Sequence, residues 1–109
     1  MELVETEVGG VRVVTVEGRL DSANAPTVEQ SLLDVVKQGD VVLDMGGLGY
    51  VSSAGLRILL KGAKAAKAAG HQFILCNMQE MVLEIFRISR FDQILTAYPT
   101  REEAVAALG

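Results

Sequence analysis

The sequence predicts a single α/β domain with a mixed, mostly parallel, four- to five-stranded sheet, an N-terminal hairpin and about four helices. The chain has 109 residues, a length at which one domain buries roughly two-thirds of its unfolded surface. Of these residues, 50% are hydrophobic but only 5% are aromatic, so Val, Leu, Ile and Ala must form the core. Short apolar runs alternate with segments of helical periodicity, which is typical of a parallel sheet covered by helices.

The first third of the chain is predicted to form a β-hairpin and then a helix. Two β-rich runs, residues 3–8 and 11–16, are separated by residues 9–10, which are both glycine. Glycine accepts the positive φ that a tight hairpin turn needs. After a polar loop, a helix is expected from about Pro26 to a stop at Gly39. The apolar positions of this helix are Val28, Leu32 and Val35.

The middle of the chain is predicted to contain a short buried strand and a long amphipathic helix. Residues 41–43 form a continuous apolar run, as in a strand with both faces covered. The glycines at 46, 47 and 49 are expected to form a tight turn that leads to a helix beginning at about Ser53. Its apolar stripe consists of Leu56, Leu59, Leu60 and Ala63. A basic stripe on another face consists of Arg57, Lys61, Lys64 and Lys67.

The last third of the chain is predicted to contain two strands and two helices. Residues 73–75 are expected to form a buried strand, and residues 94–95 a further short one. A helix is expected between them over about residues 79–88. The last helix opens with Thr100 and Glu103, which fit a capping box because each can bond the other's orphan N–H. The side chains of the earlier helix that are expected to lie together are Met81, Ile85 and Ile88.

Charge and hydropathy argue against two classes of partner. The formal net charge of −4 opposes nucleic-acid binding, which depends on neutralising phosphates. No apolar run reaches the roughly 18 residues of a membrane span, and residues 1–5 lack the regions of a signal peptide. The one cysteine, Cys76, cannot form an internal disulfide and is expected to be a small buried hydrophobe. We expect a soluble cytoplasmic protein that binds no nucleic acid and inserts into no membrane.

The usual patterns of a catalytic or cofactor site are not found. A serine hydrolase needs a histidine base, but the only histidine, His71, follows a helix-ending glycine, where an exposed turn residue is expected. Residues 46–49 lack both the dinucleotide fingerprint and the P-loop ending. His71 and Cys76 alone do not make a metal cluster. We therefore expect no enzyme activity, cofactor or metal. The basic stripe has no interleaved aromatic residues and is interpreted as a solvated helix face.

Ser52 and Ser53 are the most informative residues, because they stand between the predicted strand and the predicted helix. A serine at that point lies beside unpaired backbone N–H groups and at the positive end of the helix dipole. It is therefore either a helix cap, worth about 1 kcal/mol, or a place where a phosphate is well tolerated. Asp21 follows an earlier strand. In open α/β sheets, ligands favour the edge where strands end, and we expect Asp21 and both serines there.

Two motifs resemble those of a known family. Residues 50–56 (Tyr-Val-Ser-Ser-Ala-Gly-Leu), preceded by Val-Leu-Asp at 42–44, resemble the signature of the STAS domain, the anti-sigma-factor antagonist family. Residues 18–25 (Gly-Arg-Leu-Asp-Ser-Ala-Asn-Ala) resemble the family's first conserved loop, which often begins Gly-Glu-Leu-Asp. The resemblance covers nearly the whole chain and implies a single STAS domain over residues 1–109, whose fold has the element order predicted above.

The resemblance implies a binding protein without catalysis. Family members bind a serine kinase that doubles as an anti-sigma factor, and they displace the sigma factor from it. The kinase inactivates them by phosphorylating a serine that matches Ser53, and a PP2C-type phosphatase restores them. The residue before this serine is Asp in the best-known antagonists but Ser52 here, which makes Ser52 the second candidate for phosphorylation. The family's loop Asp matches Asp21.

Two functions follow from the resemblance. One is an anti-sigma-factor antagonist that sequesters the kinase when unphosphorylated and releases it when phosphorylated at Ser53. The alternative is an adaptor subunit of a stress-signalling assembly or of a membrane complex that transports lipids or anions. The partner-binding residues expected for the first function are Asp21, Ser22, Asn24, Ser52, Ser53, Ala54 and Arg57.

Overall fold

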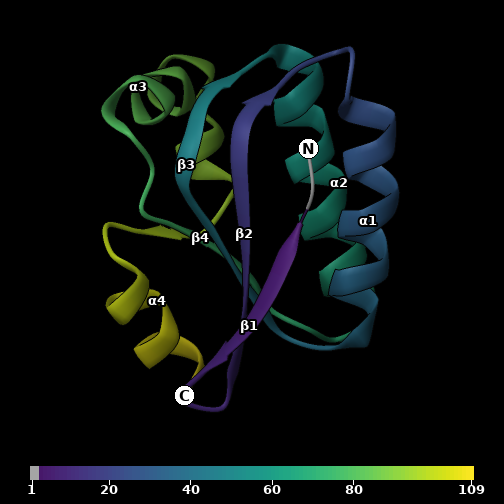
Figure 1. Cartoon of the computed structure of the whole chain (residues 1–109), viewed down its shortest axis with the longest axis vertical. Helices are drawn as coiled ribbons and strands as arrows, with labels where there is room; N and C mark the ends of the chain where they lie inside the picture. The colour runs from purple at the N-terminus through teal and green to yellow at the C-terminus, as the bar shows by residue number, and fades with distance from the viewer. Residues whose placement is uncertain (1–2) are drawn as a thin grey trace.

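The computed structural model describes residues 3–109, which form one five-stranded sheet with helices on both faces (Figure 1). The strand order is β1-β2-β3-β4-β5, in which β1 and β2 are antiparallel and the other neighbours are parallel. The strands are β1 (Val4–Val8), β2 (Val11–Leu20), β3 (Val41–Val51), β4 (Phe73–Cys76) and β5 (Ala97–Tyr98). The helices are α1 (Ala25–Gln38), α2 (Ser53–Ala68), α3 (Glu80–Ser89), the short 3-10 helix η1 (Phe91–Gln93) and α4 (Arg101–Leu108). The predicted fold class is confirmed.

Two hydrophobic clusters fill the spaces between the sheet and its helices. Successive side chains of a strand point to opposite faces, so neighbouring residues enter different clusters. Leu43 of β3 belongs to the larger cluster, which also contains Leu32 of α1 and Leu59 of α2. Its neighbour Val42 belongs to the smaller cluster, together with Ala104 of α4. The apolar run in β3 is thus explained, because α1 and α2 lie on one side of the sheet and α4 on the other (Figure 1).

The predicted hairpin is confirmed, together with its turn. Val8 pairs with Val11 across the two glycines. Gly9 has φ of 57° and Gly10 has φ of 80°. Both central residues of a type I′ turn need such positive angles, which glycine adopts without steric cost. β2 then continues to Leu20 and reaches the edge of the sheet at which α1 and α2 begin.

The predicted turn at Gly46, Gly47 and Gly49 is wrong, because these residues lie inside β3, a strand of 11 residues. They lie beside the register shifts in the pairing of β2 with β3. A Cβ at Gly47 would lie 2.7 Å from the Cγ of Glu17, and a Cβ at Gly46 would clash with the side-chain amide of Asn77. The glycines therefore permit close approach of neighbouring segments, and β3 runs directly to the start of α2.

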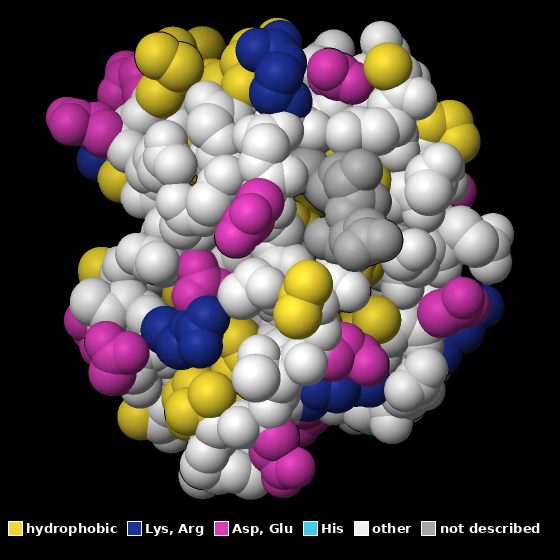
Figure 2. Space-filling model, viewed as in Figure 1, with side chains coloured by type: hydrophobic (Ala, Val, Ile, Leu, Met, Phe, Trp, Pro, Cys, Tyr) yellow, Lys and Arg dark blue, Asp and Glu magenta, His cyan; other side chains and the backbone are white. Residues whose placement is uncertain are grey.

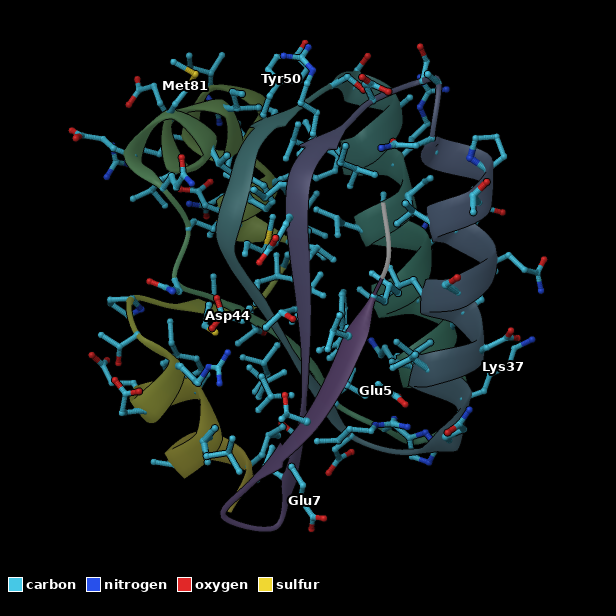
Figure 3. The ribbon with its side chains drawn as sticks, viewed as in Figure 1. Glu5, Glu7, Lys37, Asp44, Tyr50 and Met81 are labelled. Atoms are coloured by element: carbon cyan, nitrogen blue, oxygen red, sulfur yellow. The ribbon has the colours of Figure 1, made fainter. Side chains whose placement is uncertain are left out.

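The buried face of α3 differs from the predicted one. Val82 and Phe86 are fully buried, and Ile85 is half-buried. Met81 and Ile88 are instead 65% and 77% exposed. Phe86 is the largest fully buried side chain. Because it faces the core, the buried residues of α3 are Val82 and Phe86, each one position after the predicted Met81 and Ile85. Met81 points outward at the upper left of the molecule (Figure 3), where apolar side chains gather on the surface (Figure 2).

The predicted strand at residues 94–95 is wrong as well. The N–H groups of Ile94 and Leu95 both donate to the carbonyl of Phe91, at 3.0 and 2.9 Å, so the chain is still turning after η1. Leu95 is buried and Ile94 is 58% exposed. The last strand is β5, which begins at Ala97.

The starts of the helices lie within one residue of their predicted positions. α1 begins at Ala25, one residue before Pro26, and α2 begins at Ser53. In the capping box of α4, the Oγ1 of Thr100 accepts a hydrogen bond from the N–H of Glu103 at 3.1 Å, as predicted. The carboxylate of Glu103 accepts a hydrogen bond from the hydroxyl of Thr100 at 3.3 Å. The capping box predicted instead that this carboxylate accepts from the backbone N–H of Thr100.

Candidate partner-binding site

The ends of β2 and β3 bring the two sequence motifs together. Leu20, the last residue of β2, pairs with Val51, the last residue of β3. The N–H of Ser52 donates to the carbonyl of Leu20 at 2.9 Å, which extends the ladder by one bond. Because the strands are parallel, the turn that begins at Asp21 and the start of α2 emerge at the same edge of the sheet, the one formed by the carboxyl ends of β2 and β3.

The turn between β2 and α1 is held by its own polar side chains. The Oδ1 of Asp21 accepts from the N–H groups of Ala23 and Asn24, at 3.0 and 3.4 Å. The Oδ1 of Asn24 accepts from the N–H of Asp21 at 3.0 Å, and its Nδ2 donates to the carbonyl of Arg19 at 2.6 Å. Asp21 and Asn24 thus fix the shape of the loop, while Ser22 is exposed at its tip.

The two serines have different environments. Ser52 is the N-cap of α2, and its Oγ accepts from the N–H of Gly55 at 3.2 Å. Ser53 is the first residue of the helix and its side chain is exposed. Among the hydrogen bonds within residues 3–109, none uses the Ser53 hydroxyl. The sequence alone did not decide which of the two serines caps α2. In the structure, the cap is Ser52.

Gly55 allows α2 to begin close to the end of β2. A Cβ at this position would lie 2.8 Å from both the Cγ and the carbonyl oxygen of Leu20, and 3.0 Å from the Cγ1 of Val51. Real Cβ atoms almost never come that close to other atoms. The small residue in the Ser-Ala-Gly-Leu sequence is thus what places the first turn of α2 directly against the Asp21 turn.

A groove of about 270 Å³ runs between the first halves of α1 and α2. Ala54 is half-buried and Arg57 is exposed along it. Lys61 and Glu29 close its far end, with 3.1 Å between Nζ and Oε1. The residues that line the groove are Ala25, Pro26, Glu29, Ala54, Arg57, Ile58 and Lys61. All seven predicted partner-binding residues thus belong to the turns and helix starts at this edge of the sheet, and two of them, Ala54 and Arg57, line the groove.

Sequence reasoning missed Arg19 as a member of this surface. Its guanidinium lies 4.5 Å from the ring centroid of Tyr50, and its Nε lies 3.7 Å from the Oδ2 of Asp21. Tyr50 marks the upper end of β3 in Figure 3. The available signal was the first motif itself, in which Arg19 occupies the position where the family often has Glu.

Asp44, inside the second motif, was also missed, and it has a structural role. Its Oδ2 pairs with the Nε of Arg101 at 2.8 Å, and its Oδ1 accepts from the N–H of Gly46 at 2.9 Å and the Nδ2 of Asn77 at 3.2 Å. Burial alone would raise the pKa of this carboxyl group, but the three donors together hold it below its ordinary value of 3.8. Figure 3 shows Asp44 on the side of the sheet that faces α4, well below Tyr50.

The other candidate residues lie away from the site. His71 is half-buried, whereas an exposed turn residue was predicted, and its Nδ1–H donates to the carbonyl of Val36 at 2.9 Å. Cys76 is fully buried as predicted, and burial raises the pKa of its thiol to about 12. Within residues 3–109, no three His, Cys, Asp or Glu side chains are grouped as a metal site would require. None of the helices in that part of the chain has the length and apolar character needed to cross a membrane.

Comparison with known proteins identifies the family. The model of the STAS domain family matches residues 3–104. BtrV of Bordetella bronchiseptica, whose name describes it as a candidate anti-sigma factor antagonist, is 38% identical over 109 residues, which cover 98% of this chain and 94% of that protein. The crystal structure of an anti-sigma factor antagonist from Mycobacterium paratuberculosis has a TM-score of 0.86 at 25% identity and covers 97% of this chain and 92% of that one.

A second solved structure shares the fold at lower identity. It is the Bacillus cell fate determinant SpoIIAA in its phosphorylated form, with a TM-score of 0.69 at 18% identity, covering 99% of this chain and 100% of that one. The family match and the identity to BtrV agree with the two motifs that meet at the edge of the sheet. The chain belongs to the STAS domain family of anti-sigma-factor antagonists.

Proposed function

We propose that this chain is an anti-sigma-factor antagonist whose binding to a serine-kinase anti-sigma factor is switched by phosphorylation of Ser53. The unmodified protein sequesters the kinase in the cytoplasm, and the phosphorylated protein releases it. A PP2C-type phosphatase restores the binding form. The protein acts by binding and catalyses no reaction. The observation that carries the proposal is the exposed hydroxyl of Ser53 at the first position of α2, beside the Asp21 turn.

The division of roles between the serines supports Ser53 over Ser52 as the acceptor. Ser52 holds the N–H of Gly55, and a kinase would have to break this cap to reach its oxygen. The substitution of the family's Asp by Ser52 leaves the helix start intact, because Asp and Ser are about equally good N-caps. A relative of the same fold, SpoIIAA, is known in a phosphorylated form.

The contact surface of the proposed complex is the edge of the sheet around Ser53. Asp21 and Asn24 shape the loop that presents Ser22, and Ala54 and Arg57 border the groove between the first halves of α1 and α2. A partner that covers this edge buries the Ser53 hydroxyl. A phosphate on that oxygen then falls inside the interface.

The electrostatic energies indicate that the phosphate weakens the complex and leaves the fold intact. A phosphate adds a charge of about −1.5 to −2. Within this chain, the first N–H groups and the dipole of α2 favour an anion by roughly 0.3–1 kcal/mol. Across the interface, a doubly charged phosphate about 5 Å from a partner carboxylate costs up to roughly 7 kcal/mol at an effective dielectric constant near 20. A third of this cost weakens binding by more than about tenfold.

The test is phosphorylation of the purified protein by candidate serine kinases of the anti-sigma type with ATP, followed by intact mass measurement and peptide mapping. We expect one phosphate, on Ser53, and none in Ser53→Ala. Ser52→Ala is the matched control, because it removes the neighbouring hydroxyl and should still accept the phosphate. Calorimetry should show that Ser53→Ala binds the kinase as the unmodified protein does, whereas Ser53→Asp binds at least about tenfold more weakly.

Two outcomes would contradict the proposal. One is a phosphorylated protein that binds the kinase as tightly as before. The other is the absence of phosphate from both serines together with stable binding to a membrane transport complex, which would favour the adaptor function.

A further inference from the structure

A second concave site lies at the other end of α2 from Ser53. It is a pocket of about 350 Å³ between the last turns of α2, the start of β4 and the segment that leads to β5. Its apolar lining includes Leu60, Phe73, Ile94 and Leu95. Ile94 is 58% exposed, one of the few large apolar side chains left open to solvent among residues 3–109. The volume falls within the roughly 300–1,000 Å³ of small-molecule sites.

The charged residues on this pocket are all basic. Lys64 and Lys67 line it together with His71, and no Asp or Glu is among its lining residues within the described part of the chain. The formal net charge of the whole chain is −4, so the pocket is a local excess of positive charge. The Nδ1–H of His71 is held by the carbonyl of Val36, which leaves Nε2 as the ring atom available to a ligand.

The two lysines are not needed to complete the fold. The carbonyls that end α2 accept from the backbone N–H groups of Ala69, Gly70 and His71. Lys61 of the same basic stripe pairs with Glu29 at 3.1 Å. In contrast, no ion pair within residues 3–109 involves Lys64 or Lys67. An anion that joins an apolar group would match both parts of the lining.

We infer that this pocket binds a medium-chain fatty acid. The hydrocarbon tail lies over Leu60, Phe73 and Ile94, and the carboxylate lies between Lys64 and Lys67. The tail removes the exposed apolar surface from water, and the two ammonium groups orient the head group. A small amphiphile is favoured over a protein partner because the lining is concave and its charge has one sign. The inference is independent of the switch at Ser53.

The experiment is an amide NMR titration of the 109-residue chain with octanoate below its micelle concentration. We expect saturable shifts at the pocket residues, and an affinity that falls about three- to fourfold for each methylene removed in hexanoate. The double variant Lys64→Gln with Lys67→Gln should weaken binding about fivefold. Lys61→Gln is the matched control and should leave the affinity unchanged, since Lys61 does not line the pocket.

Three results would overturn the inference. The first is the absence of saturable shifts. The second is a response centred on Met81 and Ile88, because that would be adsorption to the exposed apolar side of α3. The third is equal binding of octanol and octanoate, which would show that the lysines recognise no carboxylate.

Discussion

At the scale of single residues, the edge of the sheet depends on a few side chains with separate tasks. Ser52 satisfies a backbone N–H of α2, and Gly55 lets that helix start against the end of β2. Asp21 and Asn24 bond each other's backbone and fix the facing turn. Ser53 has none of these tasks and is exposed. A modification of Ser53 therefore changes the surface of the molecule without removing a bond that holds it.

This division of tasks predicts different losses in the free energy of unfolding for substitutions of Ser52 and of Ser53. Ser52→Ala removes the cap and should lower the free energy of unfolding by about 1 kcal/mol, and Ser52→Asp should restore it. Ser53→Ala is the matched control and should change stability by less than about 0.5 kcal/mol. Urea unfolding followed by circular dichroism measures all three. A larger loss in Ser53→Ala than in Ser52→Ala would show that the capping roles are assigned wrongly.

The close approach at Gly55 predicts a second contrast. Alanine is normally the better helix former by about 1 kcal/mol, but its Cβ here would lie 2.8 Å from two atoms of Leu20. We expect Gly55→Ala to destabilise the protein by about 1–3 kcal/mol through overpacking. Gly49→Ala is the control, since its Cβ would lie no closer than 3.9 Å to any neighbour. Equal thermal unfolding midpoints for the two variants would contradict the argument.

At the scale of elements, α4 packs on the sheet through the buried Ala104, the partly buried Val105 and Leu108, and one ion pair. Ala104 is the only buried residue of this helix, and Arg101 in its first turn reaches Asp44 of β3. The side chain of Asp44 is 8% exposed and that of Arg101 is 32% exposed. The pair therefore joins segments 57 residues apart in the sequence, and it places a carboxylate inside an otherwise apolar strand.

The ion pair predicts a pH-dependent cost for Arg101→Gln. The pKa of Asp44 is depressed in the folded state, so its ionised form stabilises the fold above the unfolded pKa, and this contribution is lost as the pH falls through the folded pKa. Arg101→Gln removes two of the contributions that lower this pKa, the hydrogen bond and the charge of Arg101, so the pKa of Asp44 rises. We expect a loss of about 1–3 kcal/mol at pH 7 that narrows as the pH is lowered towards 4.

Urea unfolding between pH 7 and pH 4 measures this loss. Arg87→Gln removes a surface pair with Glu84, in which both side chains are more than half exposed, and should cost less than about 0.5 kcal/mol at any pH in that range. If the loss in Arg101→Gln did not change with pH, its origin would lie in packing and the electrostatic argument would fail.

The elements that the sequence predicts well are those with a local physical signal. The two glycines of the hairpin, the serine before α2 and Thr100 before α4 each specify a turn or a cap through their own backbone. The wrongly predicted turn at residues 46–49 concerns partners that are distant in sequence. Glycines in β3 accommodate Glu17 and Asn77, and neither neighbour is visible in a local pattern.

The candidate site shows the same limit. The sequence places Asp21 and the serines at strand ends, which is enough to expect them at one edge of the sheet. Which serine caps α2 depends on where β3 stops, and this is set by the pairing of Val51 with Leu20. Arg19 and Asp44 were missed because two of their partners, Tyr50 and Arg101, become neighbours only through tertiary packing.

At the scale of the whole molecule, α2 separates two surfaces. Its first residue, Ser53, belongs to the edge beside the Asp21 turn, and Lys67 in its last turn lines the pocket near β4. Both faces of the sheet are covered by clusters of buried side chains. Because Ser53 is exposed and the 16 residues of α2 span about 24 Å, more than the roughly 10 Å over which salt screens a surface charge, a charge added at one end of α2 should leave the strands and the far end of the helix undisturbed.

This separation predicts the hydrogen-exchange response to phosphorylation. The phosphate on Ser53 accepts bonds from first-turn N–H groups of α2, so exchange should slow there and in the facing turn at residues 21–24. Exchange in β3 and β4 and around Lys67 should be unchanged, because their bonds and buried contacts do not involve Ser53. Comparing unmodified and phosphorylated protein by amide exchange with mass spectrometry measures both regions, and Ser53→Ala carried through the same kinase reaction is the control. Faster exchange throughout the sheet would mean that the phosphate loosens the fold, and the switch would then act through stability rather than through the surface.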